Sequence, residues 1–150
     1  EETDVNESVQ MIFQLLDPPE GFVLNIPEPL PVLTTLSTPL EVIFRNLIGN
    51  AIKHHDNSEG IITITASERG SFYEFSVEND GPPIASQHHE QIFEMFKTLR
   101  PRDEVEGSGM GLSIIKRMLD YHGQKITITS GKERGVTFSF TWPKDFIKEG

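Results

Sequence analysis

Three stretches of the chain carry apolar residues at the spacing of an amphipathic helix. They comprise Val5, Val9, Ile12, Phe13 and Leu16; then Leu40, Ile43, Phe44, Leu47 and Ala51; and finally Leu112, Ile115, Met118 and Leu119. Because residues three and four apart share one side of a helix, each stretch predicts a helix that buries one face. A further short helix is expected over residues 88–96.

The expected helices begin and end at common signals. Two prolines after Asp17 should stop the first helix, and Gly123 should close the third. Thr38 is expected to cap the second helix, with Pro39 at the first helical position and Glu41 completing a capping box. His54, His55 and His122 would then lie at helix ends, where a solvated imidazole is expected.

Short runs rich in β-branched and aromatic residues predict the strands. They cover residues 21–26, 61–66, 72–77, 125–129 and 136–142. The second and third runs should form a hairpin with its turn at residues 68–71, and the last two a hairpin around Gly131. The proline-rich residues 27–31 predict an extended loop, and residues 99–108, which lack apolar periodicity, predict a mobile one.

The order of elements predicts the fold class. Helix, strand, helix, hairpin, helix, helix and hairpin follow one another, and most strands come in antiparallel pairs. We therefore expect an α+β fold, a two-layer α/β sandwich in which three main helices cover one face of a mixed, mostly antiparallel sheet. The other face should be solvated or covered by a partner. No linker or internal repeat divides the chain, so residues 1–150 should form one domain.

Composition narrows the classes of partner. A net charge of −10 argues against nucleic acid or an anionic membrane surface as a general partner, because both need an excess of Lys and Arg. The absence of cysteine excludes disulfides, iron–sulfur clusters and thiolate zinc sites. No apolar run is long enough to span a bilayer, and no signal peptide is visible. The acidic start without Met suggests a fragment of a longer protein.

The second expected helix carries polar residues opposite its apolar stripe. Asn46, Asn50 and Lys53 are spaced i, i+4, i+7 and therefore share one face. A carboxamide oxygen is a hard neutral ligand suited to Mg²⁺, and a lysine can meet a phosphate as a point charge. The alternative is that this face is simply solvated, and the helix by itself is compatible with either a ligand-binding or a solvated face.

Two glycine-containing segments are further candidates for ligand contacts. The segment Gly107-Ser108-Gly109-Met110-Gly111-Leu112 leads into a helix that should begin near Met110. The free N–H groups at that helix start suit phosphate oxygens; the alternative is a flexible loop ending in a helix. It matches neither a Rossmann fingerprint nor a Walker A sequence. Residues 77–84 end a strand at Asn79-Asp80-Gly81, where an amide or carboxylate could bind a base; a simple turn is the alternative.

Taken together, these segments resemble the ATP-binding catalytic domain of bacterial sensor histidine kinases, a branch of the ATPase superfamily shared with gyrase and MutL. Five segments carry the resemblance, and they come in the family's order. Residues 44–54 resemble its asparagine box, 77–84 its first glycine box, 92–97 its phenylalanine box, 107–116 its second glycine box, and 135–143 its final glycine–threonine–phenylalanine strand. Residues 99–104 are reminiscent of phytochrome-type kinases.

The resemblance implies roles for individual residues. Asn50 would ligate Mg²⁺, Asn46 would support the phosphate-side network, and Lys53 would contact phosphate with His54 beside it. The lid hinge and the phosphate-binding helix start would be formed by Gly107, Ser108, Gly109, Met110, Gly111 and Leu112. The base would be contacted from the first glycine box and the final strand by Asn79, Asp80, Gly81, Ile84 and Thr137.

Other implied roles fall on the segment between the two glycine boxes. Phe93 and Phe96 would anchor a mobile ATP lid, with ordinary core positions as the alternative. Lys97, Arg100 and Arg102 would neutralise charge that develops on the transferred phosphoryl group.

One box departs from the family sequence. The first glycine box usually has Asp, any residue, Gly, any residue, Gly, whereas this chain has Asn79 in place of the Asp and Pro83 in place of the second Gly. Asn79 could still accept a hydrogen bond from the adenine amino group, but this neutral bond would be weaker than one to a carboxylate. Asp80 should face the other way, because side chains alternate along a strand.

The resemblance also implies the reaction. Hydrolysing relatives have a glutamate at the position of Asn46, and an amide cannot act as a general base, so phosphoryl transfer is favoured over ATP hydrolysis. The implied acceptor is a histidine on a separate dimerisation domain of the parent kinase, with a response regulator downstream and a cytoplasmic location. The fragment alone should not phosphorylate itself. The alternatives are a degenerate, non-catalytic nucleotide-binding or protein-interaction module, motivated by Asn79 and Pro83, and a hydrolysing ATPase.

Overall fold

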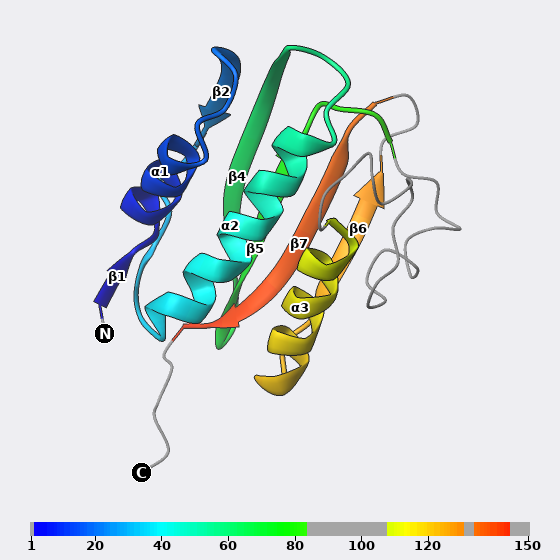
Figure 1. Cartoon of the computed structure of the whole chain (residues 1–150). Coiled ribbons are helices and arrows are strands. Elements are labelled where there is room, and N and C mark those ends of the chain that lie inside the picture. Colours follow the sequence, from blue (N-terminus) through cyan, green and yellow to red (C-terminus); the bar gives the residue numbers. More distant parts are fainter. Residues whose placement is uncertain (1, 84–107, 131–133, 145–150) are drawn as a thin grey trace.

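The computed structural model describes residues 2–83, 108–130 and 134–144 (Figure 1). The short helix expected over residues 88–96 and most of the loop expected over 99–108 lie outside these residues. So do seven of the residues given a role above, namely Ile84, Phe93, Phe96, Lys97, Arg100, Arg102 and Gly107.

Three helices and two sheets make up the described part of the chain. The helices are α1 (Val5–Leu15), α2 (Ser37–Lys53) and α3 (Ser108–Tyr121). The main sheet has five strands in the order β2 (Gly21–Asn25), β4 (Glu59–Arg69), β5 (Phe72–Asn79), β7 (Val136–Pro143) and β6 (Ile126–Ser130). β2 pairs with β4 in parallel and the other neighbours are antiparallel, so the sheet is mixed.

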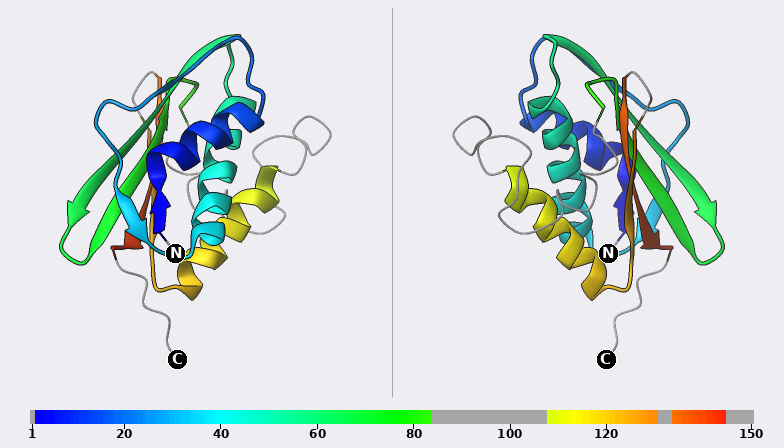
Figure 2. Two further views of the ribbon diagram at one scale, coloured as in Figure 1. Left: turned by 90° about the vertical axis from the view of Figure 1, so that its left-hand side faces the viewer. Right: turned by 90° about the vertical axis from the view of Figure 1, so that its right-hand side faces the viewer.

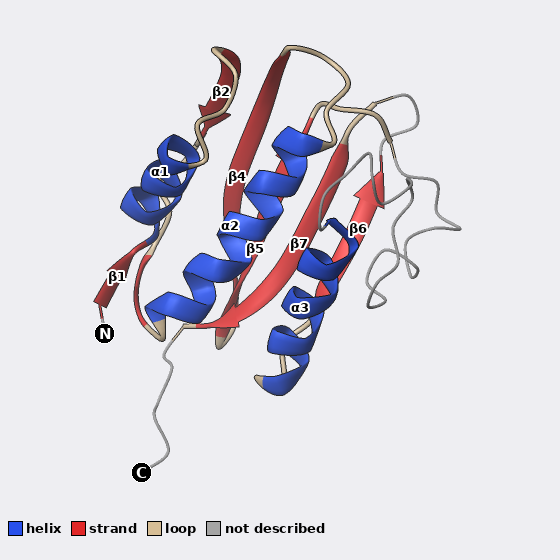
Figure 3. Ribbon diagram, in the orientation of Figure 1, coloured by secondary structure: helices blue, strands red, loops and turns tan. Residues whose placement is uncertain are grey.

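All three helices cover the same face of the main sheet, as the edge-on views of Figure 2 show. Figure 3 separates the two layers by colour, with the helices in front of the strands. The expected α+β class, the single helical layer and the mixed, mostly antiparallel sheet are thus confirmed. No helix in the described ranges is long and apolar enough to cross a membrane.

The core lies between the helical layer and the sheet. The strand β7 shows the alternation clearly, since Val136, Phe138, Phe140 and Trp142 are buried and the residues between them are half-buried. From α2, the ring of Phe44 meets Phe75 and Phe140 edge-on, with ring centroids 5.4 and 5.3 Å apart. This packing fixes α2 across the middle of the sheet.

A small second sheet was not expected from the sequence. β1 (Glu2–Asp4) pairs antiparallel with β3 (Val32–Thr34), just before α1 and just after the proline-rich segment. Each strand has only three residues, too few for an alternating pattern to stand out. The hairpin between β4 and β5 is also tighter than expected, because Gly70 adopts a positive φ of 63° and allows a turn of two residues.

The expected capping box at Thr38 is wrong. The helix α2 begins at Ser37, its N-cap is Leu36, and no side chain caps it, so Pro39 occupies the third helical position. Proline is tolerated there because the first four N–H groups of a helix have no partner within it. Glu41 accepts a hydrogen bond from Ser8 Oγ of α1 instead. A tertiary contact precedes the helix, because the buried Thr35 accepts a hydrogen bond of 2.6 Å from Trp142 Nε1.

Candidate functional site

The two asparagines of α2 lie at the border of its buried stripe. Asn46 and Asn50 are half-buried, whereas Lys53, at the end of the helix, is exposed. Asn46 Nδ2 donates to the carbonyl oxygen of Val42, one turn earlier, at 2.7 Å. Since a carbonyl accepts only from the nitrogen of the amide, this bond fixes the orientation of the Asn46 amide and leaves its oxygen as the group that can act on a ligand.

The start of α3 points toward the same end of the domain as the carboxyl-terminal end of α2. The two helices pack against each other and run in opposite directions over the same face of the sheet (Figures 1 and 2). The helix begins at Ser108, two residues earlier than expected, so Gly109, Met110 and Gly111 belong to its first turn. The N–H groups of this turn have no partners within the helix and carry the positive end of its dipole.

Leu112 differs from its neighbours in the second glycine box. Its side chain is only 6% exposed and belongs to the hydrophobic core, next to the buried Ser113. The Leu112 side chain therefore helps to hold α3 against the rest of the domain.

The end of β5 brings Asn79 onto the same face of the sheet as the helices. Asn79 pairs with Val136 of β7, and it follows the buried Phe75 and Val77 by the alternation of the strand. Its Oδ1 accepts a hydrogen bond of 2.7 Å from the N–H of Gly81, which closes a tight turn. Gly81 in turn accepts a bond of 2.8 Å from the N–H of Gly135.

The structure does not bring Thr137 together with Asn79. Thr137 pairs with Glu78, and both residues face the side of the sheet that carries no helix. The residue of β7 that shares the inner face with Asn79 is Val136, which is buried. This placement gives no support to the role expected for Thr137 near a base.

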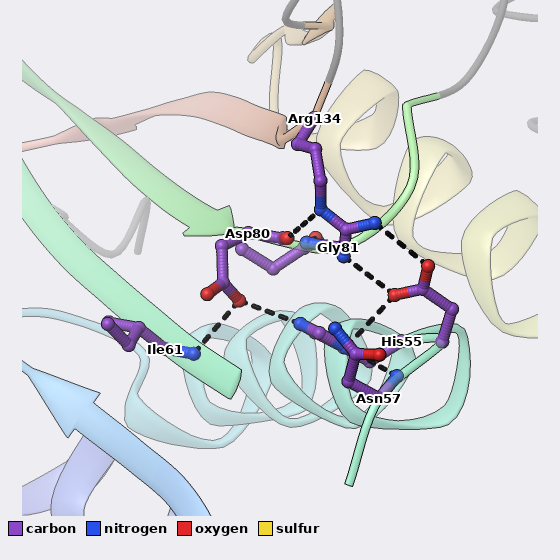
Figure 4. A network of polar contacts seen from close by, with 8 residues as sticks. His55, Asn57, Ile61, Asp80, Gly81 and Arg134 are labelled. Atoms are coloured by element: carbon purple, nitrogen blue, oxygen red, sulfur yellow. Dashed lines mark hydrogen bonds and ion pairs between the residues drawn. The ribbon is translucent and has the colours of Figure 1, made fainter. Parts of the chain in front are cut away.

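Asp80, the residue after β5, is engaged by residues other than Asn79. Its Oδ1 accepts hydrogen bonds from His55 Nε2 at 2.7 Å and from the N–H of Ile61 at 2.9 Å (Figure 4). His55 Nδ1 accepts from the N–H of Asn57 at 3.1 Å, so the ring proton is on Nε2 and donates to Asp80. Burial and the bonds have opposite effects on the pKa of Asp80: partial desolvation raises it, whereas the bonds from Ile61 and His55 together lower it by more, so the net pKa is lowered.

The expectation of a solvated imidazole at His55 is wrong. The His55 side chain is 1% exposed and packs edge-on against Phe22, with ring centroids 5.2 Å apart. Two glycines leave room for it: a Cβ on Gly60 would lie 2.8 Å from His55 Nε2, and a Cβ on Gly81 would lie 3.3 Å from its Cδ2. Glycine at both positions was the only sequence signal that could have indicated a buried ring.

An arginine joins the start of β7 to the same turn. Arg134 donates two hydrogen bonds to the carboxylate of Asp56, at 2.8 and 2.6 Å, and a third from Nε to the carbonyl oxygen of Asp80 at 3.0 Å (Figure 4). The bond from Arg134 lowers the pKa of Asp56 from 3.8 to about 2, and the pKa of Arg134 is raised in turn. We call His55, Asp56, Asp80 and Arg134 the clasp, because they tie the end of α2 to the turn after β5 and to the start of β7.

The donor set around Asn50 suits a metal that is shared with a ligand. Among the described residues, no three side chains of His, Cys, Asp or Glu come together as a metal site. A Mg²⁺ ion bound by the half-buried carboxamide of Asn50 would therefore take most of its oxygen ligands from phosphate and water, as Mg²⁺ commonly does. The carboxamide oxygen of Asn50, a single neutral donor, fits that role.

Comparison with known proteins identifies a family for the whole arrangement. The family described as "Histidine kinase-, DNA gyrase B-, and HSP90-like ATPase" matches residues 35–145. The chain is 40% identical over 116 residues to Cyanobacterial phytochrome A of Nostoc sp. (strain PCC 7120 / SAG 25.82 / UTEX 2576), a match that covers 77% of this chain but 15% of the phytochrome.

Solved structures of two histidine kinases share the fold. The nucleotide-free catalytic domain of ThkA has a TM-score of 0.76 at 29% identity, over 97% of this chain and 95% of that one. ShkA, solved at full length in complex with AMPPNP, has a TM-score of 0.79 at 26% identity, over 95% of this chain and 30% of that one. ThkA has also been solved with the response regulator protein TrrA, with a TM-score of 0.72 at 28% identity, over 96% of this chain and 41% of that one. The chain belongs to the histidine kinase-, DNA gyrase B- and HSP90-like ATPase family, and its fold is that of a histidine kinase catalytic domain.

Proposed function

We propose that this chain is the single catalytic and ATP-binding domain of a sensor kinase, that it binds Mg-ATP between α2 and α3, and that it donates the γ-phosphoryl group to a histidine on a separate dimerisation domain. In this transfer the bond between the γ-phosphorus and the β–γ bridging oxygen breaks, a bond from phosphorus to an imidazole nitrogen forms, and ADP leaves. A response regulator then takes the phosphoryl group, by analogy with the complex of ThkA with TrrA.

One observation carries the proposal: α2 and α3 run in opposite directions, so the carboxyl-terminal end of α2 and the start of α3 point toward the same end of the domain, over the face of the sheet that also holds Asn79. Asn50 then ligates Mg²⁺, the first-turn N–H groups of residues 108–111 bind phosphate, and Asn79 contacts the base. Lys53 and His54, at the end of α2, lie on the phosphate side. Asn46 supports this side through its amide oxygen.

The remaining proposed groups lie outside the described residues. Lys97, Arg100 and Arg102 would neutralise the charge on the transferred phosphoryl group, Phe96 and Gly107 would belong to the lid and its hinge, and Ile84 would contact the base. Catalysis of this kind consists mostly of positioning and electrostatic stabilisation, so the nucleophile itself need not come from this chain.

Nucleotide titration tests the proposal. The chain should bind Mg-ATP saturably, and Asn50→Ala should weaken binding about tenfold or more in the presence of Mg²⁺ but much less in EDTA. Asn25→Ala is the matched control, because Asn25 is an exposed asparagine on β2 at the far edge of the sheet. Incubation with labelled ATP should give no stable phosphoprotein. An acid-labile label on the chain alone would contradict the separate acceptor.

A non-catalytic module is the second candidate, and one observation favours it. Asp80 Oδ1 is engaged by His55 and by the N–H of Ile61, so Asp80 could replace the missing carboxylate at position 79 only by giving up these two hydrogen bonds. If the chain shows no saturable binding at millimolar nucleotide, this candidate is correct. Steady release of phosphate that is lost in Asn46→Ala would instead indicate a hydrolysing ATPase.

A further inference from the structure

The side chain of Asn79 has a fixed orientation. The N–H of Gly81 donates to it at 2.7 Å, and only the oxygen of a carboxamide can accept this bond. The amino group Nδ2 therefore lies on the other side of the amide, and within residues 2–83, 108–130 and 134–144 it makes no hydrogen bond. Rotating the amide would place an amino group against an N–H group and leave the latter unpaired at the buried Gly81.

The clasp holds the turn that imposes this orientation. The carbonyl of Gly81 accepts from Gly135, and the carbonyl of Asp80 accepts from Arg134, so both peptide groups are tied to β7. The Asp80 carboxylate is tied to His55 and to the start of β4 on the opposite side of the turn (Figure 4). Asp80 is thus unable to replace Asn79 without breaking two hydrogen bonds.

We infer from this geometry that Asn79 offers a hydrogen-bond donor to the purine, and that the domain therefore binds nucleotides with a 6-oxo group, such as ITP and GTP, at least as well as ATP. The inference rests on the proposed function, in which Asn79 contacts the base. The 6-amino group of adenine is a donor and would face the donor Nδ2, whereas the 6-oxo group of hypoxanthine or guanine is an acceptor and pairs with it.

Replacing the amino group of Asn79 by an oxygen should reverse this preference for 6-oxo purines. In Asn79→Asp, one carboxylate oxygen can still accept from Gly81 N–H, so the turn keeps its bond. The other oxygen replaces Nδ2 as an acceptor, which matches adenine and repels a 6-oxo group. A site that hydrogen-bonds one substrate group discriminates strongly against an analogue with the wrong group, so the ratio of affinities should change by about tenfold or more.

Competition binding tests the inference: Mg-ATP, Mg-GTP and Mg-ITP are each used to displace the same fluorescent nucleotide. ITP is a closer match to ATP than GTP is, because it has no 2-amino group; it differs from ATP in its 6-oxo group and in the proton on N1. The wild-type chain should bind ITP as tightly as ATP or more tightly, and Asn79→Asp should shift the ratio of dissociation constants toward ATP about tenfold or more. Asn25→Asp, which makes the same substitution at the exposed edge strand β2, should leave the ratio unchanged.

Two results would overturn the inference and leave the proposed function intact. The first is a wild-type chain that binds ATP about tenfold or more tightly than ITP. The second is an Asn79→Asp variant with an unchanged ratio of the dissociation constants for ATP and ITP. If Asn79→Asp fails to fold by circular dichroism, the wild-type ratio decides alone. Absence of saturable binding for all three nucleotides would overturn the proposed function, and this inference with it.

Discussion

His55 and Asp80 form a hydrogen-bonded pair, with His55 Nε2 2.7 Å from Asp80 Oδ1, although they lie 25 positions apart in the chain. The histidine is buried and the aspartate is half-exposed, with side-chain exposures of 1% and 51%. The pair joins the end of the helix that carries Asn50 to the turn that carries Asn79. It therefore connects the proposed phosphate side of the site to the proposed base side.

Asp80→Ala should lower the free energy of unfolding by about 1–2 kcal/mol, because the buried His55 Nε2–H and the N–H of Ile61 both lose their acceptor. Urea denaturation measures the change. Glu78→Ala is the control, since Glu78 is an exposed carboxylate two residues earlier on the helix-free face, and its effect should stay within about 0.5 kcal/mol. Equal losses in the two variants would mean that the contacts of Asp80 contribute nothing.

The pair of Asp56 and Arg134 should make stability depend on pH in the acid range. Since folding lowers the pKa of Asp56 from 3.8 to about 2, its contribution is fully present above pH 3.8 and is lost as the pH falls through 2. In Arg134→Gln the pKa of Asp56 should return toward 3.8, which NMR titration of the Asp56 carboxyl carbon can follow. An unchanged Asp56 titration in this variant would show that Arg134 is not the cause of the shift.

Two Gly→Ala variants should act in opposite directions. A Cβ on Gly60 would lie 2.8 Å from His55 Nε2 and 2.9 Å from Phe22 Cε2, so Gly60→Ala should push His55 off Asp80 and destabilise the fold by about 1–3 kcal/mol. A Cβ on Gly49 would meet only Leu16, at 3.7 Å or more, inside α2. Gly49→Ala should therefore stabilise the fold by about 0.5–1 kcal/mol, by the gain in helix propensity.

Thermal and urea unfolding of both variants decide this prediction. Loss of the His55 side-chain signal at its wild-type NMR position in Gly60→Ala, but not in Gly49→Ala, would locate the damage at the clasp. A Gly60→Ala variant as stable as the wild type would show that the space beside His55 is larger than these contacts indicate.

Periodicity in the sequence was enough to predict the layers of the fold. The apolar stripe of α2 and the alternation in β7 each repeat over many residues, so single exceptions do not obscure them. Periodicity could not show β1 and β3, which are too short to have a visible period. The capping box at Thr38 was predicted from local residue preferences, and these do not show that the chain before α2 is held by the contact of Thr35 with Trp142.

The clasp could not be predicted in the same way. Arg134 and Asp56 are 78 positions apart, and both lie in connections between elements, where no period relates one residue to another. Only the folded sheet, with β5 between β4 and β7, brings these connections to one end. The asparagines of α2 were conspicuous in the sequence, whereas the hydrogen bonds that orient Asn46 and Asn79 depend on backbone groups that the sequence does not reveal.

Under the proposed function, Asn50 and the first turn of α3 bind the same Mg-nucleotide, and NMR titration tests this most directly. On addition of Mg-nucleotide, the side-chain amide of Asn50 and the backbone amides of Gly109 and Gly111 should shift together and give one dissociation constant, while the side-chain amide of Asn25 stays unchanged. Shifts at only one of the two places, or at both with different dissociation constants, would contradict the claim.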